Sequence, residues 1–159
     1  MQLTRVFDPR AVIPDLRGDD KNEILEELIE RLAEVHTGIH HDEALEAIMK
    51  REAKMSTGII HRVAIPHALC ASAADTVGAI GICRRGVDFG SLDTVPVQLI
   101  FLLLTYPKGY EESLDVLMRL SCLLEDSGFI DALLEGDSPR AAGETLAFYE
   151  RKLALPLCS

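Results

Sequence analysis

The stretch VPVQLIFLLL, residues 95–104, is the longest apolar run in the chain. It is far shorter than the roughly 20 residues that a membrane-spanning helix needs. A strand that is apolar on both faces is typical of a sheet covered on both sides. We therefore expect Val95–Leu104 to be an inner strand of such a sheet.

The segment TVGAIGIC (76–83) predicts a second strand, which we expect to end in a turn at Arg84-Arg85-Gly86. The segment VAIP (63–66) is a short apolar piece that we expect near a sheet edge. Helical spacing of apolar residues, with cap residues at the ends, predicts helices before and after these strands in the chain. Their expected ranges are Asp20 to Gly38, Asp42 to Lys54, Gly109 to Ser127, Ile130 to Leu134 and Pro139 to Lys152. In the helix expected from Gly109 to Ser127, Leu114, Leu117 and Met118 are expected to face the core. Alternating helices and strands favour a layered α/β domain.

Composition and charge indicate the class of protein and argue against some kinds of binding partner. The 159 residues are 48% hydrophobic, as in a globular chain, and we expect one domain over 1–159. The net charge of −10 argues against nucleic acid and anionic membranes and permits a basic protein partner. The four cysteines form no CxxC pair and the N-terminus has no apolar signal core, so reduced thiols and a cytoplasmic location are expected.

His67 is the candidate functional residue, because it ends the apolar piece and follows Pro66. Proline fixes its own backbone and restricts the residue before it, so the chain entering His67 is stiff. A held histidine can be a proton shuttle, a metal ligand or a nucleophile. A strand-end histidine with one structural hydrogen bond is the plainer alternative. Hydroxyls of Ser56 and Thr57, and the charge of Arg51, suit phosphate oxygens.

These motifs together resemble the IIA component of the fructose/mannitol/nitrogen class of the bacterial phosphoenolpyruvate-dependent phosphotransferase system (EIIA type 2). The resemblance covers about residues 1–150, and the match is carried by Arg51-Glu52, Ser56-Thr57-Gly58, Ala64-Ile65-Pro66-His67, the segment VDFGSLDTVPVQLIFLLL (87–104) and IPDLRGDDKNEILEELIERL (13–32). The family fold that it implies is a mixed, mainly five-stranded sheet flanked by helices on both faces.

The resemblance implies a phosphocarrier. His67 would accept a phosphoryl group from the phosphocarrier HPr and pass it to a IIB domain, or hold it as a regulatory mark, with no metal or organic cofactor. Phosphoryl transfer depends mainly on positioning and charge stabilisation, which Arg51, Ser56 and Thr57 would supply. Ile59, Ile60, Val63 and Ile65 would form an apolar rim for the partner. The chain is expected to stand alone, without IIB or IIC segments.

Three departures from the family pattern stand out. Ser113 occupies the usual position of a second, helper histidine. Ile60, Arg62 and Ala68 stand where the family typically has glycines. His61 and Arg62 are additional polar groups, which we hypothesise reach the phosphoryl group in place of the helper; exposed loop residues are the alternative.

Other functions stay open beside the phosphocarrier. A degenerate IIA-like module could act by binding alone, without transferring phosphate. An unrelated hydrolase could use a His–Cys or His–Asp site, for which Cys70 near His67 would be a candidate. His36, His40 and His41 have a spacing that could bind zinc on a helix, although Gly38 interrupts it and we expect no metal site.

Overall fold

The computed structural model describes residues 2–58 and 61–153. Its helices are α1 (Leu3–Val6), the short 3-10 helix η1 (Pro9–Ala11), α2 (Lys21–Val35), α3 (His41–Lys54), α4 (Tyr110–Leu124), α5 (Ser127–Glu135) and α6 (Pro139–Lys152). Its strands are β1 (Val12–Ile13), β2 (Val63–Ala64), β3 (His67–Leu69), β4 (Val77–Val87) and β5 (Val97–Thr105).

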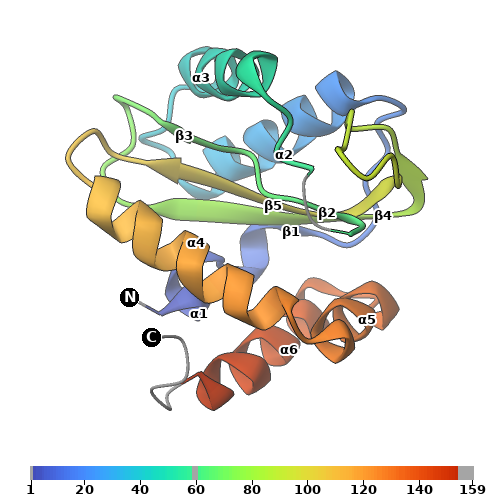
Figure 1. Cartoon of the computed structure of the whole chain (residues 1–159). Helices are drawn as coiled ribbons and strands as arrows, with labels where there is room; N and C mark the ends of the chain where they lie inside the picture. The colour runs from blue at the N-terminus through green and yellow to red at the C-terminus, as the bar shows by residue number, and fades with distance from the viewer. Residues whose placement is uncertain (1, 59–60, 154–159) are drawn as a thin grey trace.

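The five strands form one mixed sheet, in the order β1-β4-β5-β2, with β3 also paired to β5. β4 and β5 are antiparallel, whereas β2 and β3 run parallel to β5 along the same edge. Helices α2 and α3 cover one face and α1, α4, α5 and α6 the other (Figure 1). The expected mixed, five-stranded sheet flanked on both faces is therefore confirmed.

β5 is buried on both sides, as the apolar run predicted. Ile100 and Leu102 pack with α2 and α3, while Phe101 and Leu103 pack with the helices on the opposite face. All four side chains are fully buried. Because successive strand residues point to opposite faces, a strand inside two layers has to be apolar at nearly every position.

Helix caps set the ends of two helices as expected. The Asp20 carboxylate accepts a hydrogen bond from the Glu23 amide at 2.9 Å, and the Glu23 carboxylate accepts one from the Asp19 amide at 2.7 Å. Ser138 caps α6, with Pro139 as its first residue. Side chains at these positions satisfy amide groups that have no partner within the helix.

The expected turn at Arg84-Arg85-Gly86 is wrong. β4 continues through these residues to Val87, which pairs with Val97 across a register shift. Gly86 has a φ of +78°, so the irregularity is accommodated at a residue without a Cβ atom. The Arg84 guanidinium donates to the backbone carbonyls of Leu134 and Pro14, which holds the extended strand against its neighbours.

The expected core face of α4 is also wrong. Leu114 and Met118 are 47% and 51% exposed, and Leu117 is only partly buried. The buried face instead carries Ser113, Val116, Leu120, Leu123 and Leu124. Both sets have helical spacing, so periodicity alone did not distinguish them. The short helix expected at Ile130 to Leu134 begins earlier, at Ser127, where Asp126 caps it.

Candidate functional site

His67 is the first residue of β3, at the edge of the sheet beside β5. It pairs with Leu103, whose amide donates to the Pro66 carbonyl oxygen at 2.8 Å. Pro66 itself has no N–H to offer, which suits its place between two short edge strands. Ala68 and Cys70 pack in the α2–α3 layer and Ile65 in the opposite layer. Alternation along the strand therefore directs the His67 ring toward the α4 side.

The half-buried His67 ring is held by its own backbone. Nδ1 lies 2.7 Å from the carbonyl oxygen of Ile65. A carbonyl oxygen only accepts, so Nδ1 is the protonated nitrogen and donates this hydrogen bond. In the neutral ring the lone pair is then on Nε2. The contact therefore selects both the tautomer and the orientation of the ring.

The loop Ser56–Gly58 lies against the segment that enters His67. The Ile65 amide donates to the Thr57 carbonyl oxygen at 3.3 Å. The Ser56 hydroxyl donates to the Phe89 carbonyl oxygen at 2.7 Å and accepts from the Gly58 amide at 3.1 Å. The Thr57 hydroxyl donates to the Glu52 carboxylate. Both hydroxyls that the sequence suggested for phosphate thus hold the loop in this structure.

Arg51 is in the last turn of α3, a few residues before this loop. Its guanidinium donates to the Met55 carbonyl oxygen at 2.9 Å, at the C-terminal end of the same helix. A cation is favoured there, because helix carbonyls without partners carry partial negative charge. This hydrogen bond holds the Arg51 guanidinium at the residue that directly precedes the Ser56–Gly58 loop.

His61 and Arg62 each face a carboxylate. The Arg62 guanidinium bonds to Asp131 on α5 at 3.1 Å, and His61 Nδ1 lies 3.7 Å from Asp93. Arg62 has a φ of +64°, a backbone conformation that glycine adopts most easily. This is a position where the family resemblance implies glycine. The chain therefore keeps the left-handed backbone there and adds a side chain that ties the loop to α5.

Ser113 is on the buried face of α4, which covers the sheet face toward which the His67 ring points. Its amide donates to the Gly109 carbonyl oxygen at 3.0 Å in the first turn of the helix. Glu112, beside it, accepts hydrogen bonds from the hydroxyls of Thr76 and Tyr106, both at 3.0 Å. These contacts anchor the N-terminal turn of α4 to the sheet.

Cys70 does not form a pair with His67. Its thiol lies 3.5 Å from the Glu43 carboxylate and 3.3 Å from the Ser72 hydroxyl, in the α3 layer. Cys70 and Cys83 are free and buried, and burial raises the pKa of the Cys83 thiol. The fourth cysteine, Cys158, lies outside the described residues.

Residues 2–58 and 61–153 contain neither a cluster of three potential metal ligands nor a helix that could cross a membrane. No three His, Cys, Asp or Glu side chains in these ranges come together as ligands for a metal ion. His40 and His41 are instead beside the acidic groups of Glu43 and Asp42. Every helix in these ranges is too short or too polar to cross a lipid bilayer.

Two of the four residues expected to form an apolar rim around His67 are buried and do not contribute to the surface. Val63 is fully buried and Ile65 is 8% exposed, while Ile59 and Ile60 lie outside the described residues. Exposed apolar side chains instead follow α4 at intervals of four residues, which places them on one side of the helix. We call Tyr110, Leu114 and Met118, which are 62%, 47% and 51% exposed, the α4 stripe. Leu69, two residues after His67, is 50% exposed.

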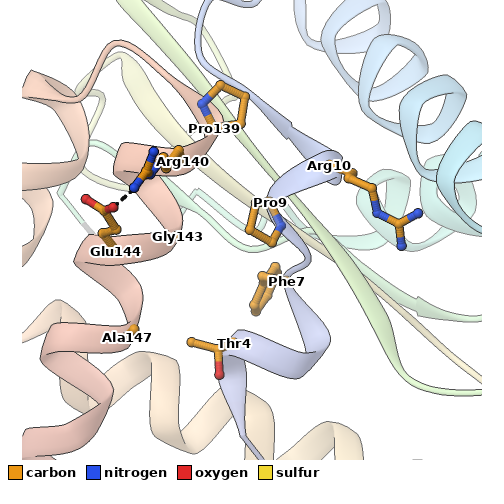
Figure 2. Close-up of a pocket in the computed structure, with 9 residues that line it drawn as sticks. All are labelled: Thr4, Phe7, Pro9, Arg10, Pro139, Arg140, Gly143, Glu144 and Ala147. Atoms are coloured by element: carbon orange, nitrogen blue, oxygen red, sulfur yellow. Dashed lines mark hydrogen bonds and ion pairs between the residues drawn. The ribbon is translucent and has the colours of Figure 1, made fainter.

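A cavity of about 710 Å³ lies elsewhere, between α6 and the α1–η1 segment (Figure 2). It is lined by Thr4, Phe7, Pro9, Arg10, Pro139, Arg140, Gly143, Glu144 and Ala147. None of the sequence-predicted site residues is among them. The two arginines at its rim are already paired, Arg10 with Asp8 and Arg140 with Glu144.

Comparison with known proteins identifies the family. The family model described as "Phosphoenolpyruvate-dependent sugar phosphotransferase system, EIIA 2" matches residues 5–148. The chain belongs to this family. This EIIA 2 chain is 33% identical over 156 residues to a nitrogen regulatory protein of Bradyrhizobium diazoefficiens, covering 98% of this chain and 97% of that one. It is 29% identical to a fructose-specific EIIA component of Haloferax volcanii, covering 82% and 72% of the two chains.

Solved structures of EIIA proteins share the fold. Nitrogen regulatory protein IIA-Ntr from Neisseria meningitidis superposes with a TM-score of 0.83 at 28% identity, covering 91% of this chain and 98% of that one. IIA mannitol from Escherichia coli superposes with a TM-score of 0.74 at 18% identity, covering 86% and 96%. The second likeness is evidence for the fold only.

In this EIIA 2 chain, sequence reasoning did not find the role of Glu52. Its side chain is only 3% exposed, and its carboxylate lies 2.6 Å from the Lys21 ammonium group. A signal was present, because Ala44, Ile48 and Glu52 follow one helical face at intervals of four. A carboxylate on an otherwise apolar face indicates a buried ionic partner.

Proposed function

We propose that this chain is a phosphocarrier in which Nε2 of His67 accepts a phosphoryl group from an HPr-like donor. The observation that carries the proposal is the hydrogen bond from Nδ1 to the Ile65 carbonyl oxygen. It leaves the lone pair on Nε2 and holds the ring. An oriented nucleophile avoids the entropy cost of finding the productive geometry during reaction.

The proposed step is a direct displacement at phosphorus. The Nε2 lone pair forms a bond to phosphorus while the bond between phosphorus and the donor breaks, and the donor keeps that electron pair. The phosphorylated His67 ring then carries positive charge and still has its proton on Nδ1. The Ile65 carbonyl oxygen accepts from this charged ring, and such charge-assisted hydrogen bonds are stronger than neutral ones.

The residues that the sequence suggested for the phosphoryl group are proposed to stabilise the transferred oxygens. Arg51 would do so through its guanidinium, and Ser113 through its hydroxyl from the helix that covers the same sheet face. Ser56 and Thr57 are proposed to contribute mainly through the conformation of their loop, since their hydroxyls bond to Phe89 and Glu52. His61 and Arg62 would first have to leave their acidic partners to take part.

The α4 stripe and Leu69 are the proposed docking surface for the donor. They combine exposed apolar area with a place on the α4 side of the sheet, toward which the His67 ring points. Burying such a patch supplies association energy without needing a deep pocket. The net charge of −10 favours a partner with a basic surface.

We propose that the phosphoryl group serves mainly as a regulatory signal. One relative that matches nearly the whole chain is a nitrogen regulatory protein, and the IIA-Ntr structure is 28% identical. The second candidate is a sugar carrier that passes phosphate to a IIB domain, which the fructose-specific relative supports. A module that binds partners without transferring phosphate is the remaining alternative. Any of these roles would place the protein in the cytoplasm, with its phosphocarrier partners.

Phosphorylation of the purified protein by phosphoenolpyruvate, enzyme I and HPr tests the proposal. Intact mass would reveal one added phosphoryl group, and His67→Ala is the control. We expect acid-labile phosphorylation that is lost in His67→Ala. If a cognate and active HPr leaves the wild type unmodified, the phosphocarrier proposal fails and the binding module is favoured. Adding a IIB domain to the phosphorylated protein then separates the sugar carrier from the regulator.

A further inference from the structure

We propose that Lys21 and Glu52 are positioning residues for the acceptor histidine, a role that rests on the proposed function of His67. Neither residue contacts the imidazole. They act through the Ser56–Gly58 loop, which bonds to the segment that orients the ring. The buried ion pair is thus linked by a short series of contacts to Nδ1 of the His67 ring, the nitrogen that holds the ring in place.

The first contacts connect two helices to the loop. The Lys21 ammonium at the start of α2 lies 2.6 Å from the Glu52 carboxylate in the last turn of α3. The same carboxylate accepts from the Thr57 hydroxyl and, at 3.3 Å, from the Thr57 amide. Thr57 is 4% exposed, so water does not readily replace these bonds. One carboxylate therefore holds both donors of Thr57.

The next contacts connect the loop to the ring. The Thr57 carbonyl oxygen accepts from the Ile65 amide at 3.3 Å. The Ile65 carbonyl oxygen, on the same residue, accepts from His67 Nδ1 at 2.7 Å. A shift of Thr57 would therefore move the backbone of Ile65. The acceptor of the ring hydrogen bond would move with it.

Lys21 also holds a second loop next to the first. Its ammonium group donates to the Phe89 carbonyl oxygen at 3.3 Å and lies 5.0 Å from the centre of the Phe89 ring. That carbonyl oxygen is the one that accepts from the Ser56 hydroxyl. Loss of the ammonium group would loosen both loops and leave the Glu52 carboxylate buried without its cation. A buried charge without a partner is strongly unfavourable.

Removing a pair that served only the stability of the fold would lower the free energy of unfolding but leave the folded ring unchanged. Removing a positioning pair would also change the hydrogen bond of the ring and the rate of the chemical step. Partners that orient a reacting group typically change activity by about 10- to 100-fold when removed. Their removal should lower kcat, while KM for the donor, which reflects docking at the α4 stripe, stays nearly constant.

The test uses Glu52→Ala, Glu52→Gln and Lys21→Met in the full chain. Glutamine keeps the shape and one acceptor for Thr57, and methionine keeps much of the apolar stem of lysine. The first readout is the ¹⁵N chemical shifts of the two His67 ring nitrogens in the unphosphorylated protein, which report the tautomer. The second is kcat and KM for phosphorylation by HPr, measured where urea denaturation shows each variant to be fully folded.

The matched control is Glu27→Gln. The Glu27 carboxylate also accepts hydrogen bonds from loop amides, but these are the amides of Arg17 and Gly18, which precede α2, and not those of the Ser56–Gly58 loop. We expect Glu27→Gln to keep the wild-type tautomer and kcat. We expect Glu52→Ala to show a mixture of tautomers and a kcat lowered by about 10- to 100-fold, with Glu52→Gln intermediate.

The outcomes separate the two proposals. If Glu52→Gln and Lys21→Met are folded and retain the wild-type tautomer and kcat, the positioning role is refuted while the phosphocarrier stands. If the wild type is never phosphorylated, the phosphocarrier fails, yet the ring shifts still decide whether Lys21 and Glu52 orient His67. Equal loss in Glu27→Gln would also refute the specific role, because any loop anchor would then have the same effect.

Discussion

His67 Nδ1 lies 2.7 Å from the carbonyl oxygen of Ile65, two residues earlier in the chain. Pro66 stands between Ile65 and His67. Its ring fixes its own φ and restricts the backbone of Ile65 before it. The acceptor of this hydrogen bond is therefore part of the same stiff turn that carries the imidazole. The ring cannot exchange its tautomer without losing this partner.

This geometry predicts which nitrogen is phosphorylated. We expect the phosphoryl group on Nε2, because Nδ1 is occupied by its proton and by the Ile65 carbonyl oxygen. Long-range ¹H–¹⁵N NMR of the phosphorylated protein distinguishes the two nitrogens. Phosphate on Nδ1 would contradict the prediction and show that the hydrogen bond breaks before transfer.

The α4 stripe predicts a variant that weakens docking without unfolding the protein. Replacing Leu114 and Met118 together by serine should raise KM for HPr about 10-fold, because exposed apolar anchors carry much of the energy of an interface. The melting temperature should change little, since both side chains are about half exposed. Phe148→Ser on α6, where the side chain is 49% exposed, is the control. A similar KM change in both variants would count against the stripe.

The backbone at Arg62 predicts an unusual order of stability between two variants. Arg62→Gly and Arg62→Ala both lose the ion pair with Asp131. Glycine adopts the φ of +64° without strain, whereas alanine does not. We expect Arg62→Gly to be more stable than Arg62→Ala by about 1 kcal/mol. Urea denaturation measures the difference, and an equal or reversed order would mean that the loop has a different path.

Removing the Ser113 hydroxyl is expected to have a modest effect on the rate of phosphoryl transfer. If its hydroxyl donates to the phosphoryl group, Ser113→Ala should lower kcat by roughly 2- to 10-fold, the value of one hydrogen bond. Ser121→Ala is the control on the same helix, because the Ser121 hydroxyl donates to the Leu117 carbonyl oxygen within α4. An unchanged kcat in Ser113→Ala would remove Ser113 from the site.

His36 predicts a pH dependence of stability. Burial lowers the pKa of His36 below its ordinary value, and Nε2 is buried without a hydrogen-bond partner among the described residues. The unfolded chain therefore takes up this proton first as the pH falls below about 6.5. The stabilisation is complete above that pH and is lost as the pH falls toward the lower pKa of the folded state.

Urea denaturation at pH 7, 6 and 5 measures this effect. The wild type should lose stability over this range, and His36→Gln should lose less. His40→Gln, which changes an exposed side chain, should follow the wild type. If His36→Gln and the wild type have the same pH dependence, the His36 ring does not contribute to it.

The large elements followed from the sequence because local signals and burial agreed. The apolar run at 95–104 indicated an inner strand, and β5 occupies Val97–Thr105. Cap residues at Asp20 and Ser138 marked helix starts that the structure confirms. In contrast, Arg84-Arg85-Gly86 resembled a turn locally, but pairing with β5 and long-range arginine contacts kept the strand extended.

By itself, the sequence determined the layers of the fold, the family, and His67 after proline as the candidate residue, because these depend on composition, periodicity and adjacent residues. Only the tertiary structure decided which face of α4 is buried, where the Ser56 and Thr57 hydroxyls bond, and that Glu52 pairs with Lys21. The bonds from Ser56 to Phe89 and from Lys21 to Glu52 join residues far apart in the chain. A side chain's partners depend on which elements the sheet brings together, and that is a property of the packed molecule.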